Sequence, residues 1–579
     1  MKVLVFAKQI PDVNQISFDP ETKRIVRENV PLLINSFDKK AVEEAIRLKE
    51  NHGCETFVAT MGPPQSKEIL NDSLRMGIDK AFLVTDRVFG GSDTLVTSRI
   101  LANVVDLVKP DIVLMGKYSL DGETSQVPPE VAVLSGYNFK SSISKIQIEE
   151  DSESCIVQHE NESGLADYRV KFPAVFSVSE KINRARAIKE DVPPMYERIQ
   201  TLNAERLGLD IVGSRDSPTV VTGTESIESG RSVEYLDYDD NLFDRILRII
   251  NREASEENEM EQVALDDFEE SRKSIWGIAL DDAEVSLEIA SKISNLAEEN
   301  GLNAVMVGNI RADLIKGMLC HKYYYLNAGE SDVLAAEIAE LIKKLNPKHV
   351  IFPSTVKGRE VSAMIAAKLG LGLTADCIDV TIKGEELIQY KPAFGGGIVA
   401  SITSKTSPRM ATARPGMFKL VKGKKEFAVE EFAVTARSSI EKLNFEPVSS
   451  DFKPLGYSDT VIGAGRGLKS RNNLAPVMEL ASRLSASVGG TRPIVDMRWM
   501  PRQQQIGLTG VSISPKTYIS LGVSGQDNHV VGIRYAGKII AINTDSKAPI
   551  FRYADFGIIA DANEFVSRFN DYLAKQQNA

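Results

Sequence analysis

Residues 505–543 have types and spacing that suit the binding of a flat ligand carrying phosphate groups. This stretch places a hydroxyl group, two glycine turns and one histidine between short β-branched runs that predict strands. Upstream, GAGRG at residues 463–467 follows a predicted strand and precedes a predicted helix. Its amides are candidates for holding phosphate at a helix N-terminus, with a structural turn as the alternative. Leu468 replaces the last glycine of the dinucleotide fingerprint, which excludes a nicotinamide Rossmann assignment.

Two side chains near this stretch have a functional and a structural interpretation. His529 is one of five histidines, and Arg492 lies in the sequence GGTRP at residues 489–493. A lone histidine is more often a satisfied structural residue than a ligand-binding one, and a loop arginine is more often solvated. Each residue alone therefore decides nothing about function.

The elements that must position these residues alternate between strand and helix from the start of the chain. We predict strands at residues 3–7, 56–60, 81–84 and 112–115, and helices that begin at Asp38, Ser66 and Thr94. Such alternation predicts a parallel sheet with helices on its faces. We expect Asp38 to cap the first helix and Glu43 to lie near Arg47.

Loops rich in glycine or hydroxyl groups follow several of these strands, at residues 61–64, 90–94 and 116–124. The carboxyl ends of parallel strands meet at one edge of an α/β sheet, where ligands bind. Three such loops at that edge predict a nucleotide site, since backbone amides there can hold phosphate.

The remaining chain divides into further parts. Residues 183–210 have mixed charge and no alternation, which predicts an extended arm. Residues 224–270 are acidic, with Leu242, Phe243 and Ile246 at helical spacing, which predicts a linker carrying one docked helix. A second strand–helix series starts at residue 275, and its end at 346–370 echoes residues 109–136, so we infer two related α/β domains. A third unit begins near residue 461.

The composition limits the classes of function. The chain of 579 residues is too long for one core, and its net charge of −11 disfavours non-specific binding to nucleic acid or anionic membranes. Since no run of 18 apolar residues occurs and Met1-Lys2 lead directly into a strand, we expect a soluble, cytoplasmic protein without membrane insertion. The four cysteines lie far apart without a CxxC motif, which argues against metal and disulfide frameworks. Redox chemistry would therefore need a borrowed cofactor.

Taken together, the motifs resemble the electron transfer flavoprotein family. GRGLKS at 465–470, GTR at 490–492, QIG at 505–507, TG at 509–510, SG at 524–525 with His529, AIN at 541–543 and APIF at 548–551 resemble the flavin domain of its α subunit. TAD at 374–376, PAFGG at 392–396 and ATARPG at 411–416 resemble that subunit's first domain. AKQIPD at 7–12 and DGETSQV at 121–127 resemble the β subunit. The chain thus resembles a β–α fusion.

The resemblance implies an α/β fold with two Rossmann-like, adenine nucleotide α-hydrolase-like domains and a smaller FAD-binding domain. We place a β-like domain with its arm at residues 1–215, the acidic linker at 216–272, the α-like first domain at 273–452 and the FAD domain at 453–579. The implied FAD-binding residues are Arg466, Gly467, Thr491, Arg492, Gln505, Gly507, Thr509, Gly510, Ser524, Gly525, His529, Asn543 and Asp561.

Three of these residues are implied to tune the flavin. Thr509 would place its hydroxyl at N5, His529 would face the ring near O2, and Arg492 would lie over or beside the ring. A one-electron-reduced flavin is anionic, so a cation about 4 Å away stabilises it by ~4 kcal/mol at an effective dielectric near 20. This corresponds to on the order of 170 mV for one electron. Arg492 and a protonated His529 are therefore expected to raise the first reduction potential.

This chain departs from the family at Leu508 and Asn528, where glutamine is usual, so the hydrogen bonds of those glutamines are not carried over. The β-like part implies a second nucleotide site. Its implied residues are Ala7, Asn35, Gly62, Asp93, Thr94, Thr97, Gly116, Asp121, Gly122, Thr124, Gln126 and Val127. Family members that only shuttle electrons hold AMP there, whereas the bifurcating type holds a second FAD and accepts hydride from NADH. DGETSQV and GSDTLVTS at 91–98 resemble the bifurcating type, which favours the second FAD.

The implied role is electron transfer from flavin dehydrogenases, such as the acyl-CoA dehydrogenases of fatty acid β-oxidation, to a membrane quinone reductase of the ETF-quinone oxidoreductase kind. Ferredoxin is a further partner in the bifurcating case. The arm at 183–210 departs from the family pattern for partner recognition. One alternative is a nucleotide-binding α/β protein without a redox role, against which the set Arg492, Thr509 and His529 argues. Another is a self-sufficient flavin dehydrogenase, for which we find no paired acid–base constellation.

Overall fold

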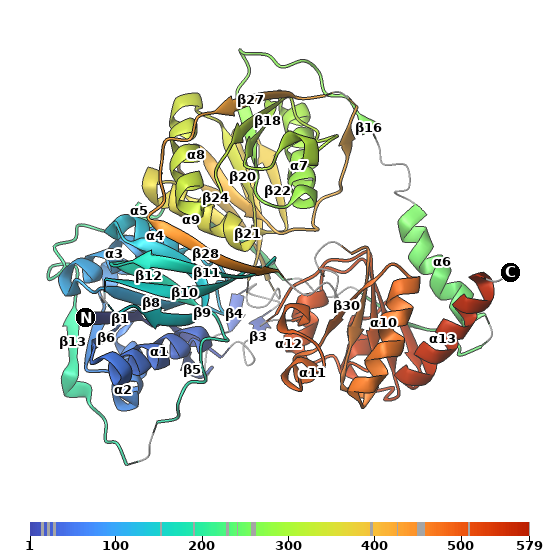
Figure 1. Cartoon of the computed structure of the whole chain (residues 1–579), viewed down its shortest axis with the longest axis horizontal. Helices are drawn as coiled ribbons and strands as arrows, with labels where there is room; N and C mark the ends of the chain where they lie inside the picture. The colour runs from blue at the N-terminus through green and yellow to red at the C-terminus, as the bar shows by residue number, and fades with distance from the viewer. Residues whose placement is uncertain are drawn as a thin grey trace.

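The protein, described by a computed structural model, forms three lobes around three large sheets (Figure 1). The structure describes residues 1–12, 17–19, 24–26, 30–150, 153–161, 163–188, 191–226, 231–239, 241–255, 262–393, 398–424, 426–447, 455, 458–507 and 510–577. We call the lobes built on these sheets the first, second and third units, in chain order. The predicted α/β class is confirmed, since each large sheet contains parallel strands covered by helices.

The first unit is built on a ten-stranded sheet in which antiparallel strands extend a parallel core. Its order is β13 (Ile199–Leu202), β7 (Lys80–Val84), β6 (Glu55–Met61), β1 (Lys2–Phe6), β8 (Ile112–Gly116), β12 (Ala174–Val178), β9 (Asn138–Ile148), β10 (Ser154–Asn161), β11 (Gly164–Lys171) and β28 (Ile440–Pro447). The helices are α1 (Ser36–His52), α2 (Lys67–Met76), α3 (Thr94–Val108) and α4 (Val127–Ser135). The inner strands form because runs of buried β-branched residues suit a sheet covered on both faces.

The second unit is built on a seven-stranded parallel sheet. Its order is β21 (Leu373–Cys377), β25 (Arg409–Ala413), β20 (His349–Pro353), β17 (Ser274–Ala279), β18 (Asn303–Gly308), β19 (Lys322–Leu326) and β27 (Ala428–Phe432). Its helices are α7 (Ala283–Asn300), α8 (Ser331–Leu345) and α9 (Val356–Leu369). A four-stranded antiparallel sheet adjoins it, formed by β14 (Thr219–Ser226), β24 (Ile398–Ser404), β23 (Glu386–Ala393) and β22 (Asp379–Lys383).

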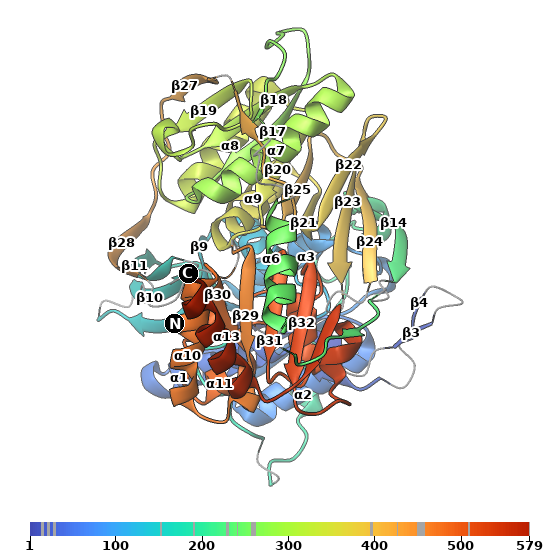
Figure 2. The same cartoon turned by 90° about the vertical axis from the view of Figure 1, so that its right-hand side faces the viewer.

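The third unit is built on a six-stranded parallel sheet. Its order is β15 (Glu234–Tyr235), β33 (Phe556–Ile559), β32 (Lys538–Asn543), β31 (Thr517–Leu521), β29 (Thr460–Ala464) and β30 (Ser487–Gly490). Its helices include α10 (Leu474–Arg483), α11 (Arg492–Asp496) and α13 (Ala562–Gln577). The helix expected in the acidic segment is α6 (Leu242–Ser255), which lies beside α13 (Figure 2). Phe243 of α6 stacks on Phe569, with ring centroids 4.8 Å apart, so this helix completes the third core.

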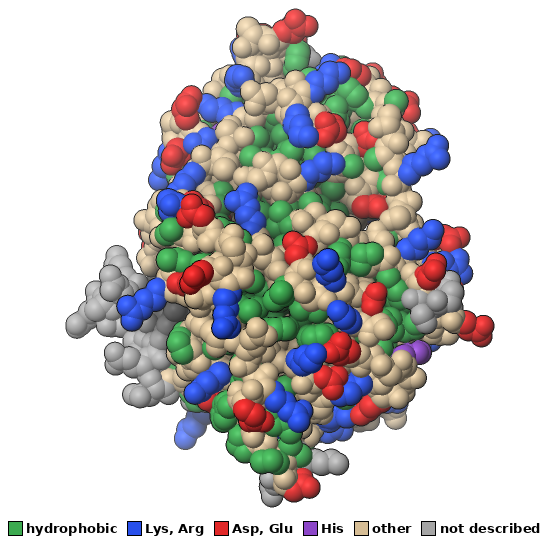
Figure 3. Space-filling model, turned by 90° about the vertical axis from the view of Figure 1, so that its left-hand side faces the viewer, with side chains coloured by type: hydrophobic (Ala, Val, Ile, Leu, Met, Phe, Trp, Pro, Cys, Tyr) green, Lys and Arg blue, Asp and Glu red, His purple; other side chains and the backbone are tan. Residues whose placement is uncertain are grey.

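The cores divide the molecule unevenly. One continuous apolar cluster joins the first and second units, from Leu4 and Val104 to Trp276 and Val361. The third unit has two apolar clusters of its own, one on each face of its sheet. Besides residues of the third unit, these clusters include only residues from the segment 233–250. On the face shown in Figure 3, Lys and Arg side chains are interspersed with Asp and Glu.

Two expectations about local structure differ from the structure. Helix α1 begins at Ser36, so Asp38 does not cap it; the Asp38 carboxylate instead accepts hydrogen bonds from the amides of Lys8 (2.8 Å) and Gly116 (2.9 Å). The predicted arm at 183–210 contains β13, which pairs with β7 at the edge of the first sheet. The ion pair of Arg47 with Glu43 is confirmed, at 3.0 Å.

The cysteines and the helices bear on two further expectations. All four cysteines are buried free thiols. Among the residues described, no helix has the length and apolar character needed to cross a membrane.

Candidate functional site

The main candidate site lies at the carboxyl edge of the third sheet, between β29 and β31. These strands are neighbours, but the chain leaves β29 toward β30 on one side and β31 toward β32 on the other. Such a reversal of strand order opens a crevice where ligands bind in open α/β sheets. The side chains of Arg466 and Ser524 are exposed after β29 and β31, and that of Arg492 is exposed at the start of α11, after β30. Guanidinium and hydroxyl donors suit phosphate oxygens, so this donor set fits a flavin dinucleotide.

The glycine run after β29 packs against the loop after β31. The Gly465 amide donates to the Leu521 carbonyl (2.9 Å), and the Gly467 amide donates to the Gly522 carbonyl (3.0 Å). A β-carbon on Gly467 would lie 2.6 Å from Gly522 Cα, so only glycine allows this approach. These two amides serve the packing of the loops, as the structural-turn alternative predicted, and are not free to hold phosphate.

Other predicted binding glycines also lie at close backbone approaches. A β-carbon on Gly525, whose φ is +83°, would lie 2.2 Å from the amide nitrogen of Ile550. One on Gly507, at φ +132°, would lie 2.3 Å from the Asn528 carbonyl oxygen, and one on Gly510 would lie 2.2 Å from that of Gln505. These glycines therefore fix the course of the loops that carry the polar groups.

Arg492 is the first residue of α11, directly after the buried residue Thr491. Its side chain is 64% exposed, and Nε lies 3.2 Å from Asp496 Oδ2, four residues along the helix. The guanidinium therefore remains accessible to a ligand, although the carboxylate neutralises part of its field. This placement agrees with either the tuning role or the solvated-loop interpretation.

His529 is buried, with 6% of its surface exposed, and both ring nitrogens have partners. Nδ1 lies 3.2 Å from the Ile506 carbonyl, which can only accept, so Nδ1 carries the proton. Nε2 then accepts from the Tyr518 hydroxyl at 2.8 Å. Burial lowers the pKa of His529 to about 4, although the bond to Ile506 opposes this. With its pKa lowered in this way, the imidazole is neutral at pH 7 in these surroundings. A protonated His529 beside a reduced flavin stays a prediction, because an anionic neighbour favours the charged form.

The other predicted residues of this site spread along the same edge. The Asn543 amide donates to the Val523 carbonyl (2.9 Å), and Gln505 is buried beside β30. Asp561 accepts from the Asn563 amide (2.9 Å) at the start of α13 and pairs with Lys469 Nζ (2.6 Å). Thr509, together with Leu508 and the residues 394–396 of PAFGG, lies outside the described residues.

Two residues within the motifs that carry the resemblance make contacts that the sequence did not predict. The Tyr518 hydroxyl donates to Nε2 of His529, and Lys469 pairs with Asp561. Tyr518 lies 11 residues before the histidine on a different element, so spacing alone carried no signal of the contact. Lys469 lies within GRGLKS, after a predicted strand, so its position could have indicated a contact at this edge of the sheet.

A second candidate site lies at the equivalent place in the first unit, between β1 and β8. The order of strands reverses there too, because β6 and β7 lie on one side of β1 and β8 on the other. Lys8 Nζ, after β1, pairs with Asp121 Oδ2, after β8, at 2.7 Å. Burial alone would raise the pKa of Asp121, but the Lys8 ammonium lowers it overall. The buried Asn35 side chain donates to the Tyr118 carbonyl at 2.9 Å, which ties the same loops together.

Several predicted residues of this second site make contacts within the protein. Asp93 caps α3 and also accepts from the Thr219 hydroxyl (2.8 Å), while the Thr94 hydroxyl donates to Gln126 Oε1 (2.8 Å). Gln126 in turn donates to the Leu373 carbonyl of the second unit (3.0 Å). Gly116 is the last residue of β8. The remaining predicted residues lie on the loops after β1, β6 and β8 or at the starts of α3 and α4: Ala7, Gly62, Thr97, Gly122, Thr124 and Val127.

The second unit repeats this arrangement with charges exchanged. Asp281 follows β17, Lys357 follows the neighbouring strand β20, and their charged atoms lie 2.6 Å apart. Beside this pair, the Arg359 side chain donates to the Ser354 carbonyl (3.1 Å), just after β20, and to Asp376 (2.9 Å). This agrees with the weak internal repeat inferred from the sequence, and it leaves the first and third units as the nucleotide-binding candidates.

Comparison with known proteins agrees with this division. The chain matches the family model for the electron transfer flavoprotein domain over residues 22–201 and 282–437, and that for the electron transfer flavoprotein FAD-binding domain over residues 454–534. The electron transfer flavoprotein subunit alpha of Clostridium acetobutylicum is 32% identical over 302 residues, 49% of this chain and 90% of that protein. The subunit beta of Thermoanaerobacterium thermosaccharolyticum is 35% identical over 257 residues, 44% and 97% respectively. Subunit CarD of the caffeyl-CoA reductase–Etf complex of Acetobacterium woodii is 38% identical over 227 residues, 38% and 86%.

The switch-point crevices and the FAD-binding match define a flavin-binding α/β protein. The chain belongs to the electron transfer flavoprotein family, and it joins counterparts of the beta and alpha subunits in one polypeptide.

Proposed function

We propose that this protein carries electrons from a flavin dehydrogenase to a quinone reductase through FAD held between β29 and β31. The observation that carries the proposal is the crevice at this strand reversal, with Arg466, Ser524 and Arg492 exposed after β29, β31 and β30 on a unit with its own core. FAD, when bound, supplies the exchange of one or two electrons. Arg466 and Ser524 would hold its phosphates, and Arg492 would lie close to the ring.

The neutral His529 contributes to this function by position. With Nδ1 donating to Ile506 and Nε2 accepting from Tyr518, it fixes the backbone of the QIG segment against β31. The field that favours an electron on the flavin would then come from Arg492, with Thr509 as the proposed hydrogen-bond donor to N5.

We propose dehydrogenases acting on acyl-CoA compounds as the electron donors. Support comes from the similarity to a subunit of a caffeyl-CoA reductase–Etf complex, since that name joins the family to a CoA-ester enzyme. The proposed division of the chain remains 1–215, 216–272, 273–452 and 453–579. Strands β14 and β15 and helix α6, from the proposed linker, also contribute to the second and third units.

We further propose that the first unit holds a second FAD and accepts electrons from NADH, with ferredoxin as a partner, as in bifurcating members of the family. Support comes from the loops at the β1/β8 reversal, which Lys8 and Asp121 join, and from the DGETSQV sequence. AMP at this place is the alternative.

The nucleotide content of the purified protein tests both proposals. After denaturation, chromatography should recover two FAD molecules for each polypeptide and no AMP. One FAD and one AMP would refute the second FAD and keep the electron carrier, whereas absence of flavin would refute the carrier itself. Bleaching of the flavin by NADH, followed by absorbance, tests the NADH step separately, because coenzyme binding alone is not chemistry.

A further inference from the structure

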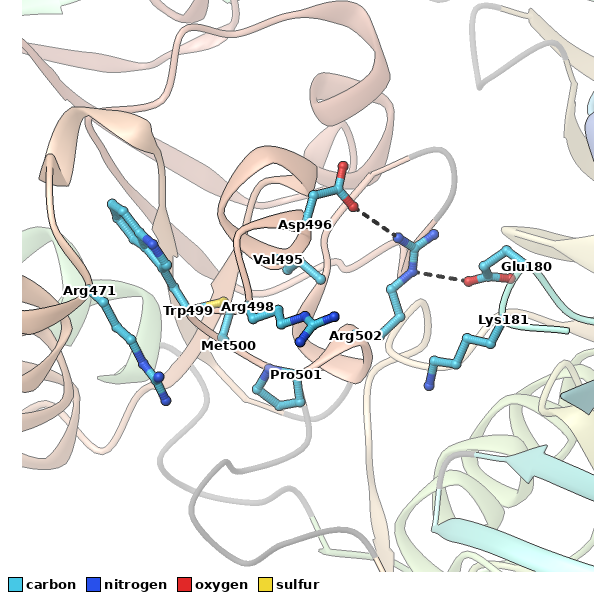
Figure 4. Close-up of a pocket in the computed structure, with 10 residues that line it drawn as sticks. All are labelled: Glu180, Lys181, Arg471, Val495, Asp496, Arg498, Trp499, Met500, Pro501 and Arg502. Atoms are coloured by element: carbon cyan, nitrogen blue, oxygen red, sulfur yellow. Dashed lines mark hydrogen bonds and ion pairs between the residues drawn. The ribbon is translucent and has the colours of Figure 1, made fainter. Parts of the chain in front are cut away.

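A pocket of about 530 Å³ lies between the first and third units (Figure 4). It adjoins the β29/β31 crevice, because its lining residue Asp496 pairs with Arg492. Glu180 and Lys181, just after β12, form one wall. The segment from Val495 to Arg502 and the side chain of Arg471 form the other. This volume falls within the usual range for small-molecule sites, and such sites favour the junction between domains.

The charges in the pocket do not balance. Arg502 Nε lies 3.1 Å from Glu180 Oε1, and Arg502 Nη1 lies 3.8 Å from Asp496 Oδ1. Lys117 also pairs with Glu180, at 3.3 Å, and Arg492 pairs with Asp496. Burial alone would raise the pKa of Glu180, but the Lys117 and Arg502 cations lower it overall. Both acidic side chains are therefore already neutralised.

Two arginines of the pocket have no such partner. Neither Arg471 nor Arg498 forms an ion pair or side-chain hydrogen bond within the described part of the chain. Figure 4 shows Arg471 beside the Trp499 indole, and Arg498 between that indole and Arg502. Two guanidinium groups with free donors around one hollow match the oxygens of phosphate groups.

The backbone at Arg498 adds an independent observation. Its φ is +58°, and its amide donates to the Val495 carbonyl (2.8 Å) to close helix α11. Glycine is the usual residue at such a position, because a β-carbon makes the left-handed conformation costly. The chain instead places a long cation there, with nothing in the described protein for it to bind. Backbone strain of this kind concentrates at ligand sites.

We propose that this pocket binds a free nucleotide, with its phosphates between Arg471 and Arg498 and its base against Trp499. An indole beside a hollow offers the flat apolar surface on which a base stacks, and the arginines supply the charge. The ligand would touch residues of both the first and third units, so its binding would favour the arrangement of the units seen here. The proposal does not depend on the electron-transfer role.

Trp499 is a built-in reporter for the test. The chain has two tryptophans, and Trp276 is 1% exposed in the core of the second unit, so a ligand in the pocket changes the emission of Trp499. The flavin-loaded protein is titrated with ADP and with inorganic pyrophosphate at constant ionic strength. We expect saturable quenching by both, with ADP binding more tightly because only ADP has a base.

Arg498→Gly is the informative variant, because it removes the cation and relieves the backbone at the same time. It should weaken ADP binding by roughly ten- to hundredfold, the range expected for the loss of one charged hydrogen-bonding group. Arg471→Gln should have a similar effect. Lys109→Gly is the matched control, since Lys109 is also an exposed cation at a helix end, with φ +51°, in the first unit. It should bind ADP as the unchanged protein does.

Three results would overturn the proposal. The first is the absence of saturable quenching, or quenching that potassium chloride reproduces. The second is equal weakening by Lys109→Gly and Arg498→Gly, which would indicate general electrostatic attraction. The third is release of FAD by ADP, measured by flavin fluorescence, which would make the pocket part of the flavin site.

Discussion

The neutral state of His529 has a consequence for stability that can be worked out from its surroundings. Burial lowers its pKa to about 4 in the folded protein, against the ordinary value of 6.5 for a histidine. Between these values the unfolded chain binds a proton that the folded protein does not. Protonation therefore favours unfolding, and the contribution of His529 is complete above pH 6.5 and is lost as the pH falls toward 4. At ~1.4 kcal/mol for each pH unit, the loss amounts to about 3 kcal/mol.

His529→Gln is the perturbation that isolates this effect. Glutamine keeps polar atoms near Tyr518 and Ile506 but does not titrate. At pH 7 the variant should be less stable by about 1–3 kcal/mol, because the two hydrogen bonds lose their geometry. As the pH falls to 4, this difference should shrink by about 3 kcal/mol. The buried His159 and His349, whose pKa values burial also lowers, contribute equally to both proteins and cancel.

Urea unfolding with excess FAD, followed by Trp499 emission in a Trp276→Phe background, measures the third unit alone. A stability difference that stays constant from pH 7 to pH 4 would refute the assignment of a buried neutral imidazole. Nitrogen NMR of labelled histidine gives a second test, since His529 should show a protonated Nδ1 and a bare Nε2 at pH 7. An imidazolium signal at that pH would contradict the contacts with Ile506 and Tyr518.

Three further predictions concern the two nucleotide sites. Arg492→Ala should lower the first reduction potential of the flavin by tens of millivolts. This is less than the full effect of a cation beside the ring, because Arg492 is exposed and Asp496 neutralises part of its charge. An unchanged potential in a spectroelectrochemical titration would show that Arg492 does not tune the flavin. Gly467→Ala should destabilise the third unit by about 1–3 kcal/mol in thermal unfolding and loosen FAD, because the added methyl overlaps the β31 loop. Gly329→Ala, at a glycine with open space around it, should be nearly neutral. Lys8→Ala breaks the pair with Asp121 and should reduce the content of the second nucleotide, measured by chromatography after denaturation, with the FAD of the third unit retained.

The sequence predicted those elements whose burial follows from a local pattern of apolar residues. The strands β1, β6, β7 and β8 appear where alternation placed them, because continuous apolar runs between turn residues admit few other arrangements. The sequence also placed candidate ligand loops at the carboxyl ends of strands, but the strand order that makes two of these edges switch points is seen only in the structure. The glycines of both sites were also visible, although their role as packing points needed the facing loop to be known.

Elements held by distant partners escaped prediction. Strand β28 is almost wholly exposed, so its sequence shows no buried face, and it forms because it pairs with β11 more than 260 residues earlier. Strand β14 likewise pairs with β24 from within an acidic segment. A local capping rule predicted that Asp38 caps the first helix, but its carboxylate instead accepts hydrogen bonds from the amides of Lys8 and Gly116. The contacts of His529 were not predicted, because Tyr518 and Ile506 lie on other segments.

The exchanged charges at the two repeated crevices bear on how a chain with two similar units folds correctly. Similar domains in one polypeptide can trade strands during synthesis. If β1 took the place of β17 beside β20, Lys8 would face Lys357; if β17 took the place of β1 beside β8, Asp281 would face Asp121. Each wrong pairing brings like charges together at a strand end, and each correct pairing brings opposite ones. The two ion pairs would therefore favour the correct strand pairings over the exchanged ones.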